Sequence, residues 1–278
     1  MKKIAIILVV LTMIFVSCKE EEIISPGSPS GLVLTATGGG TQVKLEWESP
    51  TGTSPDGYII YFKSIGSVSY TVLDTTVDTY YVHDPNGETG DYYVTAYSDA
   101  GGESGPSEVQ STIPVHTDPI TVHDLNHSGN SGYGWARASG TGASYPMSQS
   151  SSIPEVDFYI TDWEAGWDGD ANGNYYIASP DMVSQDASNT GFVPQGNWRV
   201  NGILSISISE ANSILPPSGD YANYETVVGN SYYGVHTEDD YYGVVFVSGV
   251  PNSLDGYVQV ETWFQLIPGL RLIKHSTD

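Results

Sequence analysis

Cysteine is nearly absent from this sequence, which has 278 residues and the single cysteine Cys18. One cysteine cannot form a disulfide within its own chain, and it cannot supply the ligands of a cysteine-based zinc site or an iron–sulfur cluster. Any domain in the chain must therefore be stabilised by packing and hydrogen bonds alone.

Basic residues are also scarce, with 9 lysines and arginines against 33 aspartates and glutamates, which gives a formal net charge of -24. Such a chain repels the phosphates of nucleic acids, so the composition excludes a nucleic-acid partner. The acidity has two interpretations that the sequence leaves open: solubility outside the cell, or the binding of divalent cations.

Helical periodicity is rare along the chain, whereas glycine (31), proline (16) and aromatic residues (12%) are plentiful. This composition is typical of many short strands joined by turns. The sequence therefore predicts an all-β protein, and its length is enough for two ordinary domains.

Signatures of common enzymes are missing, including Gly-x-Ser-x-Gly, His-Glu-x-x-His, the phosphate-binding loop and the dinucleotide fingerprint. His123 and His127 have a metal-compatible spacing only on a helix, and the residues around them are not helical in pattern. We therefore expect no enzymatic activity and no required cofactor. A pair of carboxylates for glycoside hydrolysis stays open, because such pairs form in space. The candidates are Glu155, Asp157, Asp162, Glu238, Asp239 and Asp240.

The N-terminus has a basic start followed by the apolar run Ile4–Val16. This run is too short to span a bilayer, which needs about 20 residues, but it fits a secretory signal. Residues 1–17 resemble the signal peptide of a bacterial lipoprotein, with Phe15-Val16-Ser17-Cys18 in place of the lipobox and Phe15 where leucine is usual. The resemblance implies cleavage before Cys18 and a firm, multi-chain lipid anchor on it. The alternative is a plain secretory signal.

Residues 18–29 are rich in Glu, Ser, Pro and Gly, which predicts a flexible tether. The acidic residues 20–22 resemble the surface-export tag of some Gram-negative lipoproteins. The leader and tether therefore predict a cell-envelope protein, an outer-membrane lipoprotein facing the cell surface, whose contact with the membrane is the lipid on Cys18.

Residues 30–114 show short runs in which apolar residues alternate with polar ones, separated by turn signals such as Pro55-Asp56-Gly57 and Pro85-Asn86-Gly87. About seven strands in a segment of this length is the scale of an immunoglobulin-like β-sandwich. The segment is similar to a fibronectin type III domain. The resemblance is carried by Pro29 with Leu32, Val43-x-Leu45-x-Trp47, Gly57-Tyr58-Ile59-Ile60-Tyr61, Tyr92-x-Val94-x-Ala96 and Ala100-Gly101-Gly102-Glu103-Ser104-x-Pro106-Ser107.

The fibronectin resemblance implies a sandwich without a disulfide, with Trp47 in the core of the second strand and Tyr92 packed in the sixth. It also implies a spacer, adhesion or interaction module, because the fold alone does not fix a function. The loop Ser98–Gly105 carries no Arg-Gly-Asp, so integrin-type adhesion is not supported.

Residues 115–278 begin at an expected hinge over 113–119 and resume the β pattern. They predict a second β-sandwich, of which a jelly roll is one form. Gly132-Tyr133-Gly134-Trp135 and the ending Gly269–Ile273 read as structural signatures. The expected strands are Val156–Thr161, Ile203–Ser209, Tyr241–Val250, Gly256–Ile267 and a closing strand Leu270–Ile273, with one helical turn at Ser209–Ile214.

One stretch of the second domain resembles the first half of an EF-hand calcium loop, with oxygen ligands at alternate positions and a glycine at the sixth. Its ligands would be Asp168, Asp170, Asn172 and Asn174. Position twelve is Ser179 in place of the bidentate glutamate, which argues against a full EF-hand. One interpretation is a looser structural calcium loop that is completed by Asp162, Glu164 or Asp181. A polar turn without an ion is the other.

Two tryptophans, Trp163 and Trp167, flank this stretch. Exposed aromatic rings on a β-sandwich can stack on sugars, but they can also pack within the protein. The sequence as a whole predicts a lipid-anchored, non-catalytic surface protein that binds or scaffolds a polysaccharide or another surface protein. The alternative is an accessory protein that binds or processes carbohydrate, with the fibronectin-like domain as a spacer.

Overall fold

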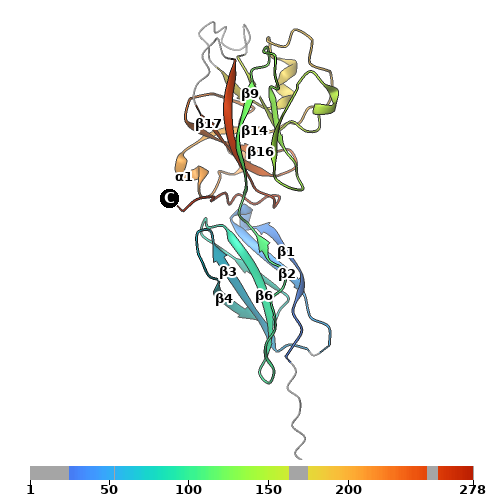
Figure 1. Ribbon diagram of the computed structural model, residues 1–278, viewed down its shortest axis with the longest axis vertical. Helices are drawn as coiled ribbons and strands as arrows, with labels where there is room; N and C mark the ends of the chain where they lie inside the picture. The colour runs from blue at the N-terminus through green and yellow to red at the C-terminus, as the bar shows by residue number, and fades with distance from the viewer. Residues whose placement is uncertain (1–24, 53, 163–174, 249–255, 278) are drawn as a thin grey trace, which may run out of the picture.

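The computed structural model describes residues 25–52, 54–162, 175–248 and 256–277. It contains two β-sandwiches stacked end to end along the long axis of the molecule, with the first domain in blue to green and the second in green to red (Figure 1). The all-β fold is as predicted. Among the described residues, no helix has the length and hydropathy that crossing a bilayer requires.

The first domain is a fibronectin type III-like β-sandwich of a three-stranded and a five-stranded sheet. One sheet has the order β1 (Ser30–Thr37), β2 (Gln42–Glu48), β5 (Tyr80–His83). The other has the order β4 (Thr71–Thr76), β3 (Gly57–Ser64), β6 (Gly90–Ser98), with β7 (Gly102–Glu103) and β8 (Gln110–Ser111) both paired to β6. Since β7 and β8 follow one edge of β6, they act as a single interrupted strand.

The core of the first domain follows the alternation in the sequence. Val43, Leu45 and Trp47 alternate on β2 and are all buried, while their neighbours face outward. Tyr92 is fully buried on β6, and its hydroxyl lies 2.8 Å from the Nδ1 atom of His83. The places predicted for Trp47 and Tyr92 are confirmed.

The second domain is a sandwich of two five-stranded sheets. The first sheet has the order β14 (Gly202–Ile206), β16 (Ser231–His236), β17 (Tyr242–Ser248), β18 (Tyr257–Phe264), β9 (Val115–His123). The second has the order β11 (Gly142–Tyr145), β10 (Gly132–Trp135), β12 (Phe158–Thr161), β13 (Tyr176–Ala178), β15 (Tyr224–Thr226). These ten described strands, of which β16, β17 and β18 form a meander, confirm the predicted second β-sandwich.

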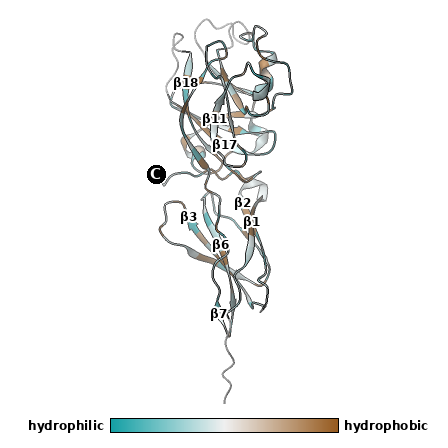
Figure 2. Ribbon diagram, turned by 45° about the vertical axis from the view of Figure 1, so that its right-hand side comes forward, coloured by the Kyte–Doolittle hydropathy of each residue, from teal (hydrophilic) through white to brown (hydrophobic). Residues whose placement is uncertain are grey.

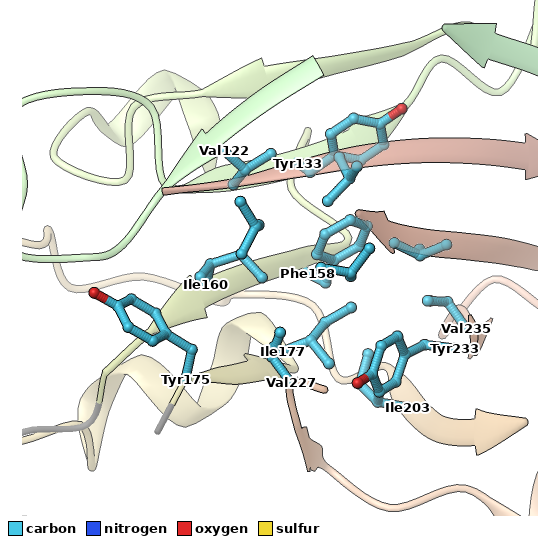
Figure 3. Close-up of a cluster of buried hydrophobic side chains, with 14 of the residues drawn as sticks. Val122, Tyr133, Phe158, Ile160, Tyr175, Ile177, Ile203, Val227, Tyr233 and Val235 are labelled. Carbon is cyan, nitrogen blue, oxygen red and sulfur yellow. The ribbon is translucent and has the colours of Figure 1, made fainter. Parts of the chain in front are cut away.

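The main core of the second domain fills the space between these sheets (Figure 3). Tyr133 and Trp135 point into it from β10, and the alternating Gly132 and Gly134 lie on the other side of the strand. A Cβ atom on Gly134 would lie 1.7 Å from the carbonyl oxygen of Glu155, so the close approach of the two chains requires glycine. The Gly-Tyr-Gly-Trp motif is therefore structural, as predicted.

Both outer faces of this sandwich are also covered. Loops pack Met147, Met182 and Trp198 against one sheet, and the short helix α1 (Ile208–Ala211) and Ile273 cover part of the other. Hydrophobic, brown stretches of ribbon occur on the strands of both domains (Figure 2). The remaining helical turns are 3₁₀ turns: η1 (Gly38–Gly40), η2 (Ser150–Ser152), η3 (Pro180–Ser184) and η4 (Ser218–Asp220).

The junction between the domains corrects two predictions. The hinge expected over 113–119 is wrong, because β9 begins at Val115 and pairs with β18 along its length. The closing strand expected at Leu270–Ile273 is also wrong, since only Leu272 forms a bridge, to Ile214. The C-terminal tail (residues 265–277) instead crosses between the domains, and Ile267, Leu270 and Leu272 are part of the hydrophobic core of the first domain.

Hydrogen bonds fix the C-terminal tail to the first domain as well. The Arg271 amide and its Nε atom donate to the carbonyls of Gly40 and Gly39, both at 2.8 Å. Lys274 forms a 2.6 Å ion pair with Glu88. A Cβ atom on Gly40 would lie 2.3 Å from the carbonyl oxygen of Gly269, so the left-handed turn of η1 meets the tail backbone directly. The two domains are thus joined by an apolar and hydrogen-bonded contact.

Candidate functional site

The lipidation, main calcium-binding and stacking residues that the sequence predicted lie outside the described residues, as does Glu164. They are the lipidation site Cys18, the calcium ligands Asp168, Asp170, Asn172 and Asn174, and the aromatic residues Trp163 and Trp167. Anchoring, calcium binding and stacking at these positions remain predictions.

Two described residues flank the predicted calcium loop, Asp162 before it and Tyr175 after it. Ser188 donates a 2.7 Å hydrogen bond to Asp162, and the Tyr175 hydroxyl lies 3.5 Å from the carboxylate of Asp124. Asp181, the other proposed ligand, follows the opposite end of the β12–β13 hairpin. Among the residues that the structure describes, no three histidine, cysteine, aspartate or glutamate side chains converge as a metal site.

The histidines near this loop are tied into the fold. His127 lies 2.6 Å from the buried carboxylate of Asp124 through its Nδ1 atom. Burial raises the pKa of Asp124, the nearby Asp162 raises it further, and the hydrogen bond from Asn126 opposes this. His123 packs its ring against Tyr257 at the end of β9. Neither histidine lies on a helix, as the sequence indicated.

We take as the candidate site a cleft of about 460 Å³ in the second domain. We call it the Trp198 cleft. Trp198 and Val200 form part of an apolar wall, and Asp181 and Glu238 border the cleft with their carboxylates. Gln195 and Asn197 line it as well, and both are exposed. A cavity of this size with a few polar groups on an apolar wall is typical of small-ligand sites; Gln195 and Asn197 add the amides.

A buried carboxylate lies behind this cleft. Asp157 is fully buried and accepts hydrogen bonds from Arg137 at 2.8 and 2.9 Å and from Arg199 at 2.6 Å. The amide of Trp135 donates to the same carboxylate at 2.9 Å. The charge of Asp157 is therefore compensated on every side, as a buried charge requires.

Arg137 extends this network to the turn between β16 and β17. It donates to both oxygens of Asp239, at 2.7 and 2.9 Å. Burial alone would lower the pKa of Arg137, but its hydrogen bonds to Asp157 and Asp239 raise that pKa, so the guanidinium stays charged. Burial would raise the pKa of Asp239, and the hydrogen bonds from Arg137 and Thr237 bring it down to about 2.

The network also positions the walls of the Trp198 cleft. The amide of Asp181 donates to the Arg199 carbonyl at 3.2 Å, and the amide of Val200 donates to Glu238 at 3.1 Å. Asn201 links the buried Asp157 to the wall of the cleft at Glu238. Its side chain donates to the Asp157 carbonyl and accepts from the Glu238 amide, both at 2.8 Å. The cleft is therefore built on a fixed network of hydrogen bonds among Asp157, Arg137, Arg199 and Asn201, which we call the frame.

Electrostatics favour a neutral or cationic occupant over an anionic one. No basic side chain lines the Trp198 cleft among the described residues. The six lysines and arginines that the structure describes all have partners within the protein. Lys44 pairs with Glu46, Lys63 with Asp91, Lys274 with Glu88, Arg137 and Arg199 with Asp157, and Arg271 with backbone carbonyls.

The sequence alone could not locate this cleft. At the level of sequence, Asp157, Glu238 and Asp239 are equal candidates among six carboxylates. In the structure, Asp157 belongs to the frame behind the cleft and Glu238 to the wall of the cleft. The amides Gln195 and Asn197 were missed. The one available signal was the clustering of Arg199 and Trp198 in a polar loop, in a chain that has few arginines.

Comparison with known proteins adds information on the first domain. No family model matches the chain, and no curated protein matches it. Several solved structures that are similar over 31% of this chain are named as fibronectin type III domains or Fn3-like proteins. One is a Fn3-like protein from Clostridium thermocellum, with 25% identity, 90% of that chain covered and a TM-score of 0.28. Others are the fibronectin type-III domain of human fibronectin type III domain containing protein 3 (29% identity, 83% covered, TM-score 0.27) and the FN5 domain of Drosophila Lar (18%, 95%, 0.25).

Proposed function

We propose that this protein is a lipid-anchored, non-catalytic arm of the cell envelope that holds a binding domain away from the membrane. The lipid on Cys18 supplies the anchor and the fibronectin type III-like domain a spacer. The tether is the part of residues 18–29 before Ser25, because Ser25 donates a hydrogen bond to the Gly101 carbonyl and Pro26 and Pro29 are buried, which corrects the predicted flexibility of residues 25–29. The second domain, with the Trp198 cleft, is the binding module. Its partner is a polysaccharide or another surface protein.

The observation that carries this proposal is the C-terminal tail. Ile267, Leu270 and Leu272 complete the core of the spacer, although the chain has already formed the second domain when it reaches them. A flexible pair of domains needs few contacts across its boundary, whereas this boundary has a shared core and an ion pair between Lys274 and Glu88. Such a contact suits a spacer that sets the distance and direction of a binding domain.

The frame of the Trp198 cleft supports a binding role over a catalytic one. A general acid or base needs a proton that it can exchange with a substrate, whereas Asp157 is fully buried and bonded to two arginines. Carboxylates held in this way position other groups. Gln195 and Asn197, which line the cleft beside the carboxylates of Asp181 and Glu238, are amides, which bind ligands without taking up protons.

Metabolic labelling with a fatty-acid analogue tests the anchored arm. The wild-type protein is expected to carry the label and to be accessible to antibody on intact cells. The Cys18→Ala variant is expected to lose the label and to leave the membrane fraction, whereas Ser17→Ala is the matched control and keeps both properties. Equal labelling of Cys18→Ala and wild type would contradict the proposal.

The calcium loop is a second element of the proposal, since it would stabilise the end of the β12–β13 hairpin beside Asp162 and Asp124. Calorimetric titration of the purified protein with calcium is expected to release heat, and a chelator is expected to lower the Tm. The variant Asp168→Asn with Asp170→Asn should abolish both effects. No heat and no change in Tm would remove the site.

A further inference from the structure

We propose that the Trp198 cleft is a subsite for one or two rings of a neutral saccharide. This inference rests on the proposed binding function of the second domain and names the chemical class of its ligand. A cleft of about 460 Å³ falls within the range of sites that hold a small organic molecule. The sequence directed attention to Trp163 and Trp167, whereas this site uses other residues.

The hydrogen-bonding groups of the cleft match a ligand with many hydroxyls. Gln195 and Asn197 are exposed, and their side chains make no hydrogen bond to other described residues, so each offers two donors and an acceptor to a ligand. Asp181 and Glu238 add carboxylate oxygens, which accept hydrogen bonds from hydroxyl groups. A sugar hydroxyl both donates and accepts, so it can use both kinds of partner.

The apolar wall supplies the other half of the match. Sugar rings have C–H faces that pack on apolar side chains, and Val200, which is 58% exposed, and Pro194 present such a surface, to which the buried Trp198 (7% exposed) adds little area. The indole of Trp198 is itself fixed, because its Nε1 atom donates to the Pro194 carbonyl at 3.2 Å. The cleft thus combines one apolar side with amides and carboxylates at its border.

Charge selects among saccharides. Asp181 and Glu238 would repel the carboxylate of a uronic acid or the sulfate of a sulfated glycan, and no described cation lines the cleft to compensate. Every described lysine and arginine already has a partner within the protein, so a rearrangement to bind an anion would break an existing contact. Charge therefore excludes the anionic saccharides, and the proposal takes the neutral ones as the ligand class.

The frame behind the cleft lowers the cost of binding. Arg199, whose neighbours in sequence line the cleft, is held by the buried Asp157 at 2.6 Å, and Asn201 links Asp157 to Glu238. Backbone that is already ordered loses little entropy when a ligand binds, so the cost of ordering falls mainly on the side chains of Gln195 and Asn197. Weak hydrogen bonds to hydroxyls can then give measurable affinity.

A glycan array tests the proposal with the full mature chain carrying Cys18→Ser, which keeps it soluble. The array holds neutral hexose and pentose oligosaccharides beside uronic-acid and sulfated ones. Binding to one or more neutral glycans is expected, with no preference for the anionic ones. The best neutral glycan is then titrated by calorimetry against wild type, against Gln195→Ala with Asn197→Ala, and against the exposed control Gln149→Ala.

The double variant is expected to bind at least fivefold more weakly, with an unchanged Tm, because both side chains are exposed. The Gln149→Ala control is expected to match wild type. An array with no neutral hits would overturn the ligand class, and equal affinity in the double variant would overturn the location. Neither result touches the anchored arm, which the labelling of Cys18 tests separately.

Discussion

The two β-sandwiches of this protein differ in how much of their surface is covered. The first domain has one hydrophobic core between its sheets, and that core includes Ile267, Leu270 and Leu272 of the C-terminal tail. The second domain has a core between its sheets and further clusters on the outer face of each. The first is a thin module completed by its neighbour, and the second is a thicker module with layers of its own.

This difference separates the two roles. Loops and a tail that pack on an outer face create the walls of clefts, and the Trp198 cleft lies in such a layer. A thin sandwich instead presents strands to water on both sides and acts as a spacer. The spacer becomes directional because the tail of the binding domain closes its core.

The largest effect is expected from the buried carboxylate of the second domain. Asp157→Ala leaves Arg137 and Arg199 without their main partner in a largely buried place, and removal of one partner of a buried ion pair costs about 3–5 kcal/mol. Urea denaturation followed by hydrogen exchange should show this loss in the second domain. A loss below about 1 kcal/mol would mean that Asp157 is not the centre of the frame.

The next largest effect is expected from the C-terminal tail, and it tests whether the first domain depends on the tail for its core. Leu270→Ala removes a fully buried side chain from the core of the first domain, although Leu270 follows the second domain in sequence. A loss of about 2–5 kcal/mol is expected, seen as faster hydrogen exchange in β2 and β6. Leu266→Ala is the control, because that side chain is 36% exposed. Unchanged exchange in β2 and β6 would show that the first domain does not depend on the tail.

A smaller effect depends on pH. The pKa of Asp239 is about 2 in the folded protein, below its ordinary value, so the stability it contributes is full above about pH 4 and is lost as the pH falls through 2. Its side chain is 40% exposed, so solvent limits this contribution to about 1 kcal/mol or less. Asp239→Asn should therefore lower the free energy of unfolding at pH 6 and approach wild type near pH 2. An equal difference at both pH values would contradict this account.

The smallest effect is expected at the junction. Lys274→Met removes the ion pair with Glu88, whose side chain is 39% exposed, and exposed pairs contribute about 0.2–1 kcal/mol. Denaturation at low and high salt should show that the difference from wild type shrinks as salt rises. A salt-independent loss would indicate that the stem of Lys274 acts through packing.

The first domain could be predicted from its sequence because its signals are local. The alternation of Val43, Leu45 and Trp47 gives the buried face of β2, and Pro85-Asn86-Gly87 marks a turn. Asn86 and Gly87 indeed have positive φ angles there. Strands and turns of this kind are specified by residues close in sequence.

The second domain was harder because several of its elements contradict local rules. Pro119 lies within β9 and suggested a hinge, but the strand is at the edge of its sheet, where proline is tolerated. The tail Leu270–Ile273 has the apolar residues of a strand, yet it packs between the domains with a single bridge. Its partner surface lies more than two hundred residues earlier in the chain, at Gly39 and Gly40, and no local pattern indicates it.

The candidate site illustrates the same limit. Arg137, Asp157, Arg199 and Glu238 come from four separate segments, and they meet only through the packing of both sheets. A sequence gives no basis for assigning different roles to its carboxylates, because their partners are determined by the fold. Asp157 differs from the others because two arginines reach it, which is a fact of three-dimensional structure.

The most direct test of a fixed arrangement of the two domains is a distance distribution between spin labels at their far ends. Asp78 lies in the β4–β5 turn, and Val228, which is 57% exposed, precedes β16, each at the end of its domain away from the tail. Labels at Asp78→Cys and Val228→Cys, in a chain carrying Cys18→Ser, are expected to give one narrow distribution that broadens in Leu270→Ala. A broad distribution in the unmodified junction would contradict a spacer fixed by the tail.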